Sequence, residues 1–398
     1  MGAGIIGCAV AYYLAKKRSR VIVIEKKERI CSGASGANSG GIPLSLLSPE
    51  SPVIEMQKAS LKLYETLSEE IGYDVEYERV GLLTCAVEEA QYLAIKRHAE
   101  GMCRKGINVK LIEGNEIRKQ EPALGGNIIA GVEDEETGIL NPFKVAHGFA
   151  RAAKNLGTEF LLATEAQTIE MDKDKVMAVV TDKGRIKTDF IVNAAGPWAP
   201  EIGKMVGLTI PIEPIKGQVI LTEPVALNKK WRYIMDADYL SHGAASAVDS
   251  KDLNIRLGIA GSLIQHKTGN WNIGSSHELS FDKEVTMQTI GCIARRAIEF
   301  MPMLKHANCI RTFTGLRPHC YMDDLPIIGK VDSPSGFIIA TGHLGAGVIL
   351  APITGKLISE LITENKTSLP IDAFAFSRFN NWKLNQAKSE PGKQNGNN

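Results

Sequence analysis

Three glycines at the start of the chain have the spacing of a dinucleotide-binding turn. Gly2, Gly4 and Gly7 form a GxGxxG motif, whose first glycine makes a tight turn and whose second lets the backbone approach a pyrophosphate. The third allows close packing of helix on strand, and the phosphates lie at the N-terminus of that helix. Glu25 follows the next predicted strand, where a carboxylate binds ribose hydroxyls and disfavours a 2′-phosphate. A glycine-rich turn beside a surface glutamate is the alternative.

Three further turns contain small residues that suit ligand binding. Residues 33–41 (GASGANSGG) offer free backbone N–H groups to a pyrophosphate or a flavin edge, although a flexible connector has the same composition. Residues 193–198 (NAAGPW) follow the end of a predicted strand, where doubly wound sheets bind ligands, with a simple turn as the alternative. Residues 342–347 precede an apolar helix whose N-terminus would stabilise negative charge. His343 is the titratable side chain of this turn.

Arg317 is the candidate ligand for a carboxylate. The sequence GLRP at 315–318 places it beside a proline-stiffened turn. A guanidinium group binds a carboxylate through two parallel hydrogen bonds, which a lysine cannot reproduce. Taken alone, an arginine is more often the partner in a surface salt bridge.

The elements that would position these residues follow from apolar periodicity. A helix is predicted over 4–18, and the all-apolar run VIVI at 21–24 is typical of a buried parallel strand. Asn141-Pro142 supplies an N-cap and a first turn for a later helix. The remaining elements predicted in the first half are helices over 53–71 and 142–156 and strands over 79–87, 176–181 and 189–193.

The pattern of apolar and turn residues changes between residues 208 and 313. Short β-prone runs alternate there with turn residues, which predicts a mixed or antiparallel sheet with a helix over 283–300. The turn residues are Lys216-Gly217, Thr268-Gly269-Asn270 and Gly274-Ser275-Ser276. An α/β pattern then returns, with a strand over 337–340 and a helix to about 362. Residues 383–398 are polar and predict a frayed tail.

Composition limits the class of protein. The chain has 398 residues, 44% of them hydrophobic and 23% charged, which excludes a disordered or fibrous protein and favours two or three domains. With 46 basic and 45 acidic residues the net charge is +1, so no binding to nucleic acid or to an anionic membrane is predicted.

Cysteine usage and apolar runs bear on location. Seven cysteines without a CxxC pair argue against a disulfide scaffold and a zinc site, so no metal is expected and a reducing cytoplasm is predicted. Residues 5–8 look like a lipoprotein cleavage box, but no basic region or apolar segment precedes them. The longest apolar stretches, near 3–15 and 344–354, fall short of the ~18 residues of a transmembrane helix.

In this order the motifs resemble the D-amino-acid oxidase-like (DAO) superfamily of FAD-dependent oxidoreductases, over nearly the whole chain. The matching features are GxGxxG with Glu25, GASGANSGG, NAAGPW, KGQ at 216–218 and the block GLRP…LPIIG…TGHLGAG. Within the superfamily, IGSSHE at 273–278, ARRA at 294–297 and APITG at 351–355 look most like one group. That group contains glycine and sarcosine oxidases, proline and hydroxyproline dehydrogenases and β subunits of hydrogen cyanide synthase.

The resemblance implies an α/β fold, with a doubly wound GR2-type FAD-binding domain and a mixed-sheet α+β substrate domain. The first would comprise 1–48, 140–207 and 326–378, the second 49–139 and 208–325, and 379–398 would be a disordered tail. Arg317 would bind the substrate carboxylate, with Tyr239, in a substrate-domain strand, as a second candidate. The implied FAD ligands are Gly2, Gly4, Gly7 and Glu25 for the ADP half, Ser35, Asn38, Gly40 and Gly41 for the pyrophosphate and flavin, and Ala195, Gly196, Trp198, Gly342, His343, Gly345 and Gly347 around the flavin.

The resemblance also implies a reaction. A small amino acid or secondary amine, such as glycine, sarcosine, proline or hydroxyproline, would be oxidised to an imine by hydride transfer from Cα to flavin N5. Electrons would then pass to partner subunits with an iron–sulfur or flavin relay, or to a respiratory acceptor. One alternative is a 2-hydroxy-acid dehydrogenase of the same fold, which needs a base, with His343 and His319 available. The other is a non-catalytic or truncated subunit that lacks flavin.

The N-terminus bears on that last alternative. A dinucleotide fold feeds its GxGxxG turn from a central strand of about five residues, and no such strand precedes Gly2. We therefore expect either that the true coding sequence starts upstream, with a short polar start and an apolar β-branched run, or that the chain binds FAD poorly.

Overall fold

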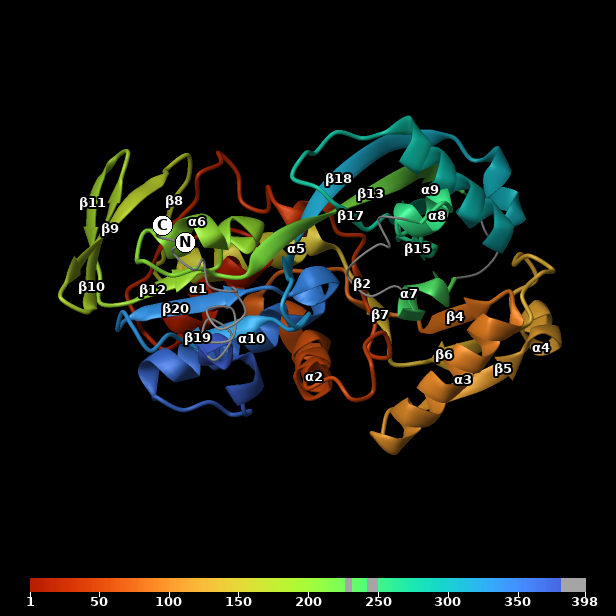
Figure 1. Ribbon diagram of the computed structural model, residues 1–398, viewed down its shortest axis with the longest axis horizontal. Coiled ribbons are helices and arrows are strands. Elements are labelled where there is room, and N and C mark those ends of the chain that lie inside the picture. The colour runs from red at the N-terminus through yellow and green to blue at the C-terminus, as the bar shows by residue number, and fades with distance from the viewer. Residues whose placement is uncertain (226–230, 242–249, 381–398) are drawn as a thin grey trace, which may run out of the picture.

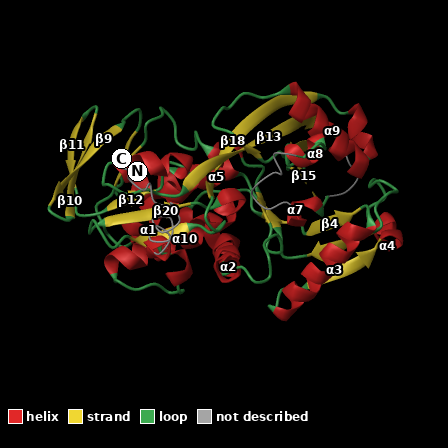
Figure 2. Cartoon of the chain, in the orientation of Figure 1, coloured by secondary structure: helices red, strands yellow, loops and turns green. Residues whose placement is uncertain are grey.

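The computed structural model describes residues 1–225, 231–241 and 250–380, which form two lobes side by side (Figure 1). An α/β lobe lies at the left of the view, and a lobe built on one large sheet lies at the right. Helices and strands alternate in the first lobe, while strands dominate the second (Figure 2). The long strands β13 (Ile212–Pro224) and β18 (Cys309–Cys320) run from the region between the lobes into the sheet lobe.

Two small sheets form the centre of the α/β lobe, and the start of the chain connects them. The Gly2 amide donates to the Ile24 carbonyl at 2.8 Å, and the Ala194 amide donates to the Met1 carbonyl at 3.0 Å. The backbone of residues 1–2 therefore lies between the two sheets. Their strands are β1 (Ile22–Ile24) parallel to β8 (Glu159–Leu161), and β12 (Ile191–Asn193) parallel to β20 (Phe337–Thr341), which pairs antiparallel with β19 (Ile327–Lys330).

Apolar helices pack around these strands. Helix α1 (Ile5–Lys16) contacts α5 (Pro142–Asn155) and α10 (Gly347–Thr363). Gly355 makes the α1–α10 contact possible, because a Cβ there would lie 2.7 Å from the Ala9 carbonyl carbon. Helix α2 (Val53–Ile71) also packs on α10, although it falls in the segment expected for the substrate domain.

Smaller elements complete the α/β lobe. An antiparallel three-stranded sheet lies at the outer edge of this lobe (Figure 1), and residues 41–42, 78–79 and 138–139 form a second one. The elements are β9 (Ala166–Asp172), β10 (Lys175–Thr181), β11 (Gly184–Lys187), β2 (Gly41–Ile42), β3 (Glu78–Arg79), β7 (Gly138–Ile139), α6 (Ala199–Lys204), and the 3₁₀ turns η1 (Ala34–Ala37), η2 (Gly196–Trp198), η4 (Leu344–Ala346), η5 (Asp372–Phe374) and η6 (Phe376–Phe379).

The nine-stranded sheet of the second lobe is assembled from two distant stretches of chain. Strands β4 (Leu82–Ala86) and β14 (Tyr233–Asp236) join the stretches in parallel, while the other pairs are antiparallel, so the sheet is mixed as predicted. Helix α9 (Met287–Phe300) packs on this sheet, and its Phe300 shares a core with Trp271. The other elements are β5 (Val109–Glu113), β6 (Ala130–Asp134), β15 (Ser262–Gln265), β16 (Asn270–Gly274), β17 (Glu278–Leu279), α3 (Glu89–Arg104), α4 (Gly114–Gln120), α7 (Asp238–Ser241), α8 (Leu253–Arg256) and η3 (Pro302–His306).

Two predicted turns are wrong. Lys216-Gly217 lies inside β13, and the GLRP segment at 315–318 lies inside β18. In the ladder Gly217 stands opposite Gly315, and Pro214 opposite Pro318. Proline has no backbone N–H group. Two facing prolines therefore fit a non-hydrogen-bonded pair of an antiparallel ladder, where neither residue donates to the other. The predicted tail at 383–398 lies outside the described residues.

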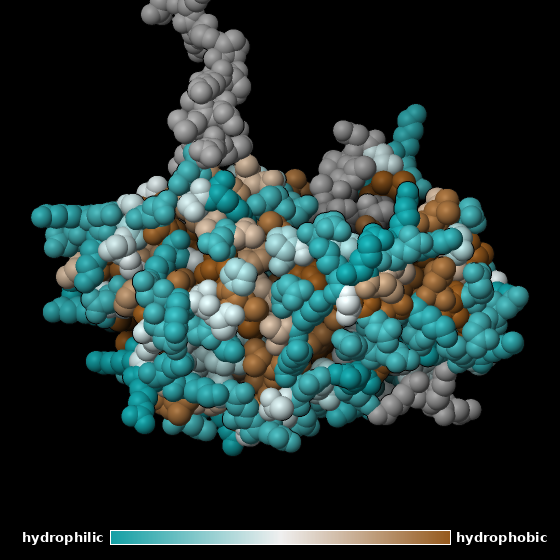
Figure 3. All heavy atoms as spheres, turned by 90° about the horizontal axis from the view of Figure 1, so that it is seen from below, coloured by the Kyte–Doolittle hydropathy of each residue, from teal (hydrophilic) through white to brown (hydrophobic). Residues whose placement is uncertain are grey.

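One stretch has the length and hydropathy of a membrane span. The helical stretch at 344–363 is longer than the apolar run predicted at 344–354. An 18-residue window in it has a mean hydropathy of 1.4, but 61% of that window is buried inside the fold. Its helix α10 packs on α1 and α2, which accounts for its apolar composition. On the face seen in Figure 3, apolar side chains form separate patches among polar ones rather than a continuous band.

Candidate active site

A cavity of about 1060 Å³ lies between the two lobes. This volume is at the upper end of the range of about 300–1,000 Å³ for small-molecule sites. The predicted site residues that line it are Gly2, Gly4, Glu25, Ser35, Asn38, Gly41, Ala195, Gly196, Trp198, Tyr239, Arg317, His343, Gly345 and Gly347. Turns far apart in the sequence are thus brought to one space.

The first turn of α1 and Glu25 form one end of the cavity. Glu25 accepts hydrogen bonds from the Ala3 amide through Oε2 and from the Lys27 amide through Oε1, each at 2.8 Å. A carboxylate has four lone pairs, so both oxygens keep capacity for hydroxyl donors. The Ser35 hydroxyl, from the 33–41 loop, accepts from the Ile5 amide at 3.0 Å and thereby holds that loop over the start of α1.

Three predicted glycines lie behind the cavity rather than in its lining. A Cβ on Gly7 would lie 1.9 Å from the Gly2 carbonyl oxygen, so this glycine permits the close passage of α1 over the turn. A Cβ on Gly40 would lie 2.0 Å from the Leu140 carbonyl oxygen. Gly342 has a φ of +79°, which an L side chain rarely adopts. These residues shape the backbone that the ligand would contact.

The ends of β12 and β20 supply another wall. Ala195, Gly196 and Trp198 follow β12 directly, as predicted for 193–198. The Thr341 hydroxyl at the end of β20 donates to the Gly196 carbonyl at 2.9 Å and links the two strand ends. A Cβ on Gly196 or Gly345 would meet no atom within 4 Å, so the cavity is open at both positions.

His343 is buried at the base of this wall. Its side chain is 3% exposed, and Nε2 lies 3.2 Å from the Thr354 hydroxyl. Burial lowers the pKa of His343 to about 3, because desolvation penalises the imidazolium ion. The ring is therefore neutral at physiological pH.

This burial predicts a pH-dependent stability. The folded pKa of about 3 lies below the ordinary histidine value of 6.5, so between these values the unfolded chain binds more protons than the folded chain. The contribution of this ring to the free energy of unfolding is present above pH 6.5 and is lost as the pH falls toward 3. His343→Gln should flatten the fall in urea midpoint over that window. The exposed His306→Gln is the control, and identical profiles for wild type and His343→Gln would contradict the assignment.

Arg317 projects into the cavity from β18 rather than from a turn. Its Nη1 donates to the Ser276 carbonyl and its Nη2 to the Ser275 hydroxyl, each at 3.0 Å. Gly217 makes room for the guanidinium, since a Cβ there would lie 2.4 Å from Arg317 Nη1. The side chain therefore has a fixed seat while its remaining N–H groups are available to a ligand.

Tyr239 reaches the same region, but from helix α7 and not from the predicted strand. Its hydroxyl lies 3.3 Å from the Ser275 hydroxyl, and its ring packs edge-on against His277 with centroids 5.2 Å apart. Ser275 thus connects Tyr239 with Arg317. The structure adds Ser275 and His277 to the lining, together with Tyr233, whose hydroxyl lies 3.0 Å from that of Ser262. The sequence marks Ser275 and His277 only as part of the IGSSHE motif at 273–278, and the topology of the sheet is what brings them to Arg317.

His319, the other candidate base, does not line the cavity. Its Nδ1 lies 3.0 Å from Glu213 Oε1, and its Nε2 lies 2.6 Å from Asp324 Oδ1. Both ring nitrogens are therefore occupied by carboxylates. Within the described residues no group of three or more His, Cys, Asp or Glu is placed to hold a metal ion.

The cavity fits the dinucleotide that the resemblance implies. One end offers the N-terminus of a twelve-residue helix, with a positive dipole and free N–H groups for a pyrophosphate, beside the Glu25 carboxylate for ribose hydroxyls. The glycine-lined wall at 196 and 345 leaves space for a flat ring. The residues that would hold FAD are thus separate from Arg317, which faces the same space from the sheet lobe.

Comparisons with known proteins give one consistent result. The sequence profile described as FAD dependent oxidoreductase (DAO) matches residues 1–361. The chain is 28% identical over 387 residues to glycine oxidase of Geobacillus kaustophilus, covering 95% of this chain and 96% of that protein. It is 28% identical over 381 residues to hydrogen cyanide synthase subunit HcnC of Pseudomonas aeruginosa, covering 94% and 83%. The structure of L-proline dehydrogenase from P.horikoshii superposes with a TM-score of 0.84 at 28% identity, covering 96% of each chain.

Proposed function

This chain belongs to the DAO family of FAD-dependent oxidoreductases, and on that premise we propose that it oxidises a small amino acid or secondary amine whose carboxylate binds Arg317. The placement of Arg317 carries the proposal. Among the described residues it is the one arginine that lines the cavity, which also contains the glycine-lined wall suited to a flavin. Glycine, dimethylglycine and proline, which appear in the names of similar proteins, are all amines that carry a carboxylate.

The residues of the chain would mainly orient the substrate. Arg317 would fix the carboxylate through its two-pronged donor group, and Tyr239 would support it through Ser275. Bound FAD, held by the start of α1, Glu25 and the 33–41 loop, would supply the two-electron acceptor for the Cα–H bond. The amine must be neutral, since its lone pair assists departure of the hydride.

The 2-hydroxy-acid alternative has less support from the site. An alcohol is far less acidic than an ammonium ion, so its oxidation needs a side-chain base with a pKa near the working pH. His343 has a pKa of about 3, and both ring nitrogens of His319 are already engaged. Amine oxidation requires no such base, which favours it here.

Anaerobic reduction of the bound flavin tests the function. Glycine, sarcosine and proline are each mixed with the FAD-loaded chain, with 2-hydroxyglutarate as the matched hydroxy acid. We expect at least one amine to bleach the flavin absorbance and 2-hydroxyglutarate to leave it unchanged. Reduction by 2-hydroxyglutarate alone would transfer support to the alternative.

We further propose that the electrons leave to a partner subunit or a respiratory acceptor, with slow use of oxygen. One similar protein is named as a subunit of hydrogen cyanide synthase. Turnover of the same amines with a dye acceptor, compared with turnover with oxygen alone, tests which acceptor the chain uses. Rapid turnover of the purified single chain with oxygen would contradict it.

A further inference from the structure

The seat of Arg317 depends on two consecutive residues that follow β16. The Ser276 carbonyl and the Ser275 hydroxyl accept the two guanidinium hydrogen bonds, so the direction of the fork follows the position of this short segment. Ser275 exchanges backbone hydrogen bonds with Ala260. Ser276 is fixed differently, through its side chain.

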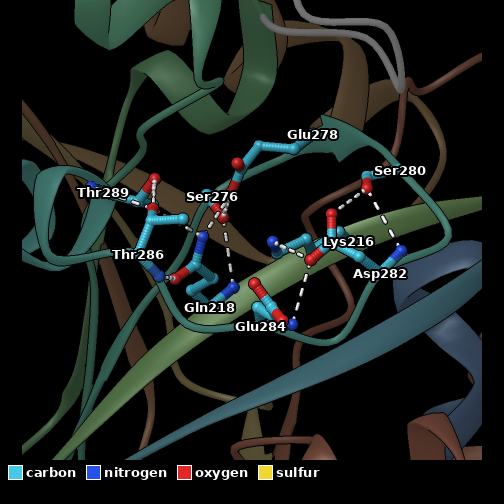
Figure 4. Close-up of polar contacts among 9 residues, drawn as sticks. All are labelled: Lys216, Gln218, Ser276, Glu278, Ser280, Asp282, Glu284, Thr286 and Thr289. Atoms are coloured by element: carbon cyan, nitrogen blue, oxygen red, sulfur yellow. Dashed lines mark hydrogen bonds and ion pairs between the residues drawn. The ribbon is translucent and has the colours of Figure 1, made fainter.

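A buried polar network holds Ser276 (Figure 4). The backbone amide of Gln218 donates to the Ser276 hydroxyl at 3.1 Å, and that hydroxyl donates to Glu278 Oε1 at 2.6 Å. Gln218 Nε2 donates to the same Glu278 oxygen at 2.8 Å, which closes a ring of three residues. Gln218 Oε1 in turn accepts from the Thr286 amide at 2.8 Å. Both Gln218 and Ser276 are fully buried.

This network lies outside the cavity lining. Gln218, Ser276 and Glu278 do not line the cavity, whereas Gly217 and Val219, the neighbours of Gln218 on β13, do. Alternate residues of a strand point to opposite faces, so β13 presents one face to Arg317 and the other to the network. The ring of three residues therefore has no direct access to a ligand, and the hydrogen bond from Arg317 to the Ser276 carbonyl links it to the cavity.

We propose that Gln218, Ser276 and Glu278 are positioning residues that hold the Ser276 carbonyl and thereby aim the Arg317 fork at the substrate carboxylate. This inference rests on the proposed function, because it requires a carboxylate at Arg317. A fork binds a carboxylate only when both prongs are aligned, and misplacement by about 1 Å can lower a rate ~100-fold. The network would thus set the preference for amines that carry a carboxylate over analogues that lack it.

A second anchor on the same face of β13 provides the control. Lys216, which is 2% exposed, donates from Nζ to Asp282 Oδ1 at 2.7 Å and fixes a later part of the segment. This hydrogen bond lowers the pKa of Asp282 to about 2. Asp282 also accepts from the Ser280 hydroxyl and the Glu284 amide, but no hydrogen bond joins it to 275–276. Asp282→Asn weakens the anchor to Lys216 and leaves the Ser276 carbonyl and the Ser275 hydroxyl, which hold Arg317, unchanged.

The experiment compares each substrate with its decarboxylated analogue in the FAD-loaded full chain. The pairs are proline with pyrrolidine and sarcosine with dimethylamine. For each pair we take the ratio of kcat/KM for the carboxylate substrate to kcat/KM for its analogue. We expect Glu278→Ala to lower this ratio ~tenfold, because kcat/KM falls for the carboxylate substrate and stays unchanged for the analogue. Glu278→Gln, which keeps an amide oxygen as acceptor, should restore most of the ratio. Ser276→Ala, a smaller change that keeps the backbone carbonyl but removes the hydroxyl that holds it, should lower the ratio in the same direction.

Binding of acetate, followed by the change in the flavin absorption spectrum, gives a readout that needs no turnover. We expect weaker acetate binding in Glu278→Ala and Ser276→Ala, and wild-type binding in Asp282→Asn. If Arg317→Lys weakens acetate binding while Glu278→Ala and Ser276→Ala do not, the positioning role is overturned and the proposed function stands. If Asp282→Asn lowers the ratio as far as Glu278→Ala, general loosening replaces positioning. If Arg317→Lys itself leaves acetate binding unchanged, the proposed function fails.

Discussion

Replacement of Arg317 by lysine should lower kcat/KM for the amine substrate by ~30- to 1,000-fold, equivalent to about 2–4 kcal/mol of transition-state binding. Lysine keeps the positive charge but has no planar fork, so it cannot form two parallel hydrogen bonds with a carboxylate. It also cannot reproduce both present contacts, to the Ser276 carbonyl and the Ser275 hydroxyl. Steady-state kinetics with the best substrate of the panel measures the loss.

Flavin content separates this effect from damage to the fold. Arg317 lies on β18, whereas Glu25 is hydrogen-bonded to the start of α1, so the Arg317→Lys variant should retain FAD. Arg311→Lys, an exposed position on the same strand, is the matched control and should behave as wild type. An unchanged kcat/KM in Arg317→Lys would remove the carboxylate assignment.

Gly7→Ala should release FAD and destabilise the α/β lobe. The new Cβ would lie 1.9 Å from the Gly2 carbonyl oxygen, a main-chain atom that cannot rotate away. Either α1 shifts from the turn or the turn opens, and both changes disturb the N–H groups that would hold the pyrophosphate. We expect the variant to purify largely without flavin, with a free energy of unfolding lower by ~1–3 kcal/mol, as for other overpacked sites.

Flavin absorbance after gel filtration measures the loss of FAD, and urea unfolding measures the loss of stability. Gly126→Ala is the control, because a Cβ there meets nothing within 4 Å and no positive φ is required. Full flavin content and unchanged stability in Gly7→Ala would show that the close helix–turn contact is not needed for binding.

Elements encoded by local pattern could be predicted from the sequence. The helices expected over 4–18, 53–71 and 142–156 correspond to α1, α2 and α5, because apolar periodicity and caps are properties of neighbouring residues. At α5 the Asn141 side chain accepts from the Lys144 amide at 3.3 Å, as its position before Pro142 indicates. The turns that line the cavity were also predictable, since each has glycines where backbone must approach a ligand.

Features that depend on distant partners were not predictable. Gly217 and Gly315 indicate a turn when only their neighbours are considered, yet they pair with each other in the ladder of β13 and β18. Gly217 is needed there for space, which Arg317 occupies. Ser275 belongs to the IGSSHE motif at 273–278, but its contact with Arg317 could not be predicted from that motif and arises only in the folded sheet. The sequence predicts a strand at Tyr239, whereas the residue lies in helix α7, which is too short to show a helical period.

The two sides of the substrate region differ in how much change they can absorb. Arg317 belongs to a long strand paired along its length with β13, where an inserted residue would turn every later side chain to the opposite face. Across the cavity, Pro43, Leu46, Leu47 and Ser48 lie in a connecting segment outside the strands and helices, with no register to keep. For directed evolution of this enzyme, libraries with substitutions and length changes belong in residues 46–51, which follow the buried Leu44 and Ser45. Variants found there would accept amines of new shape while still demanding an acid group.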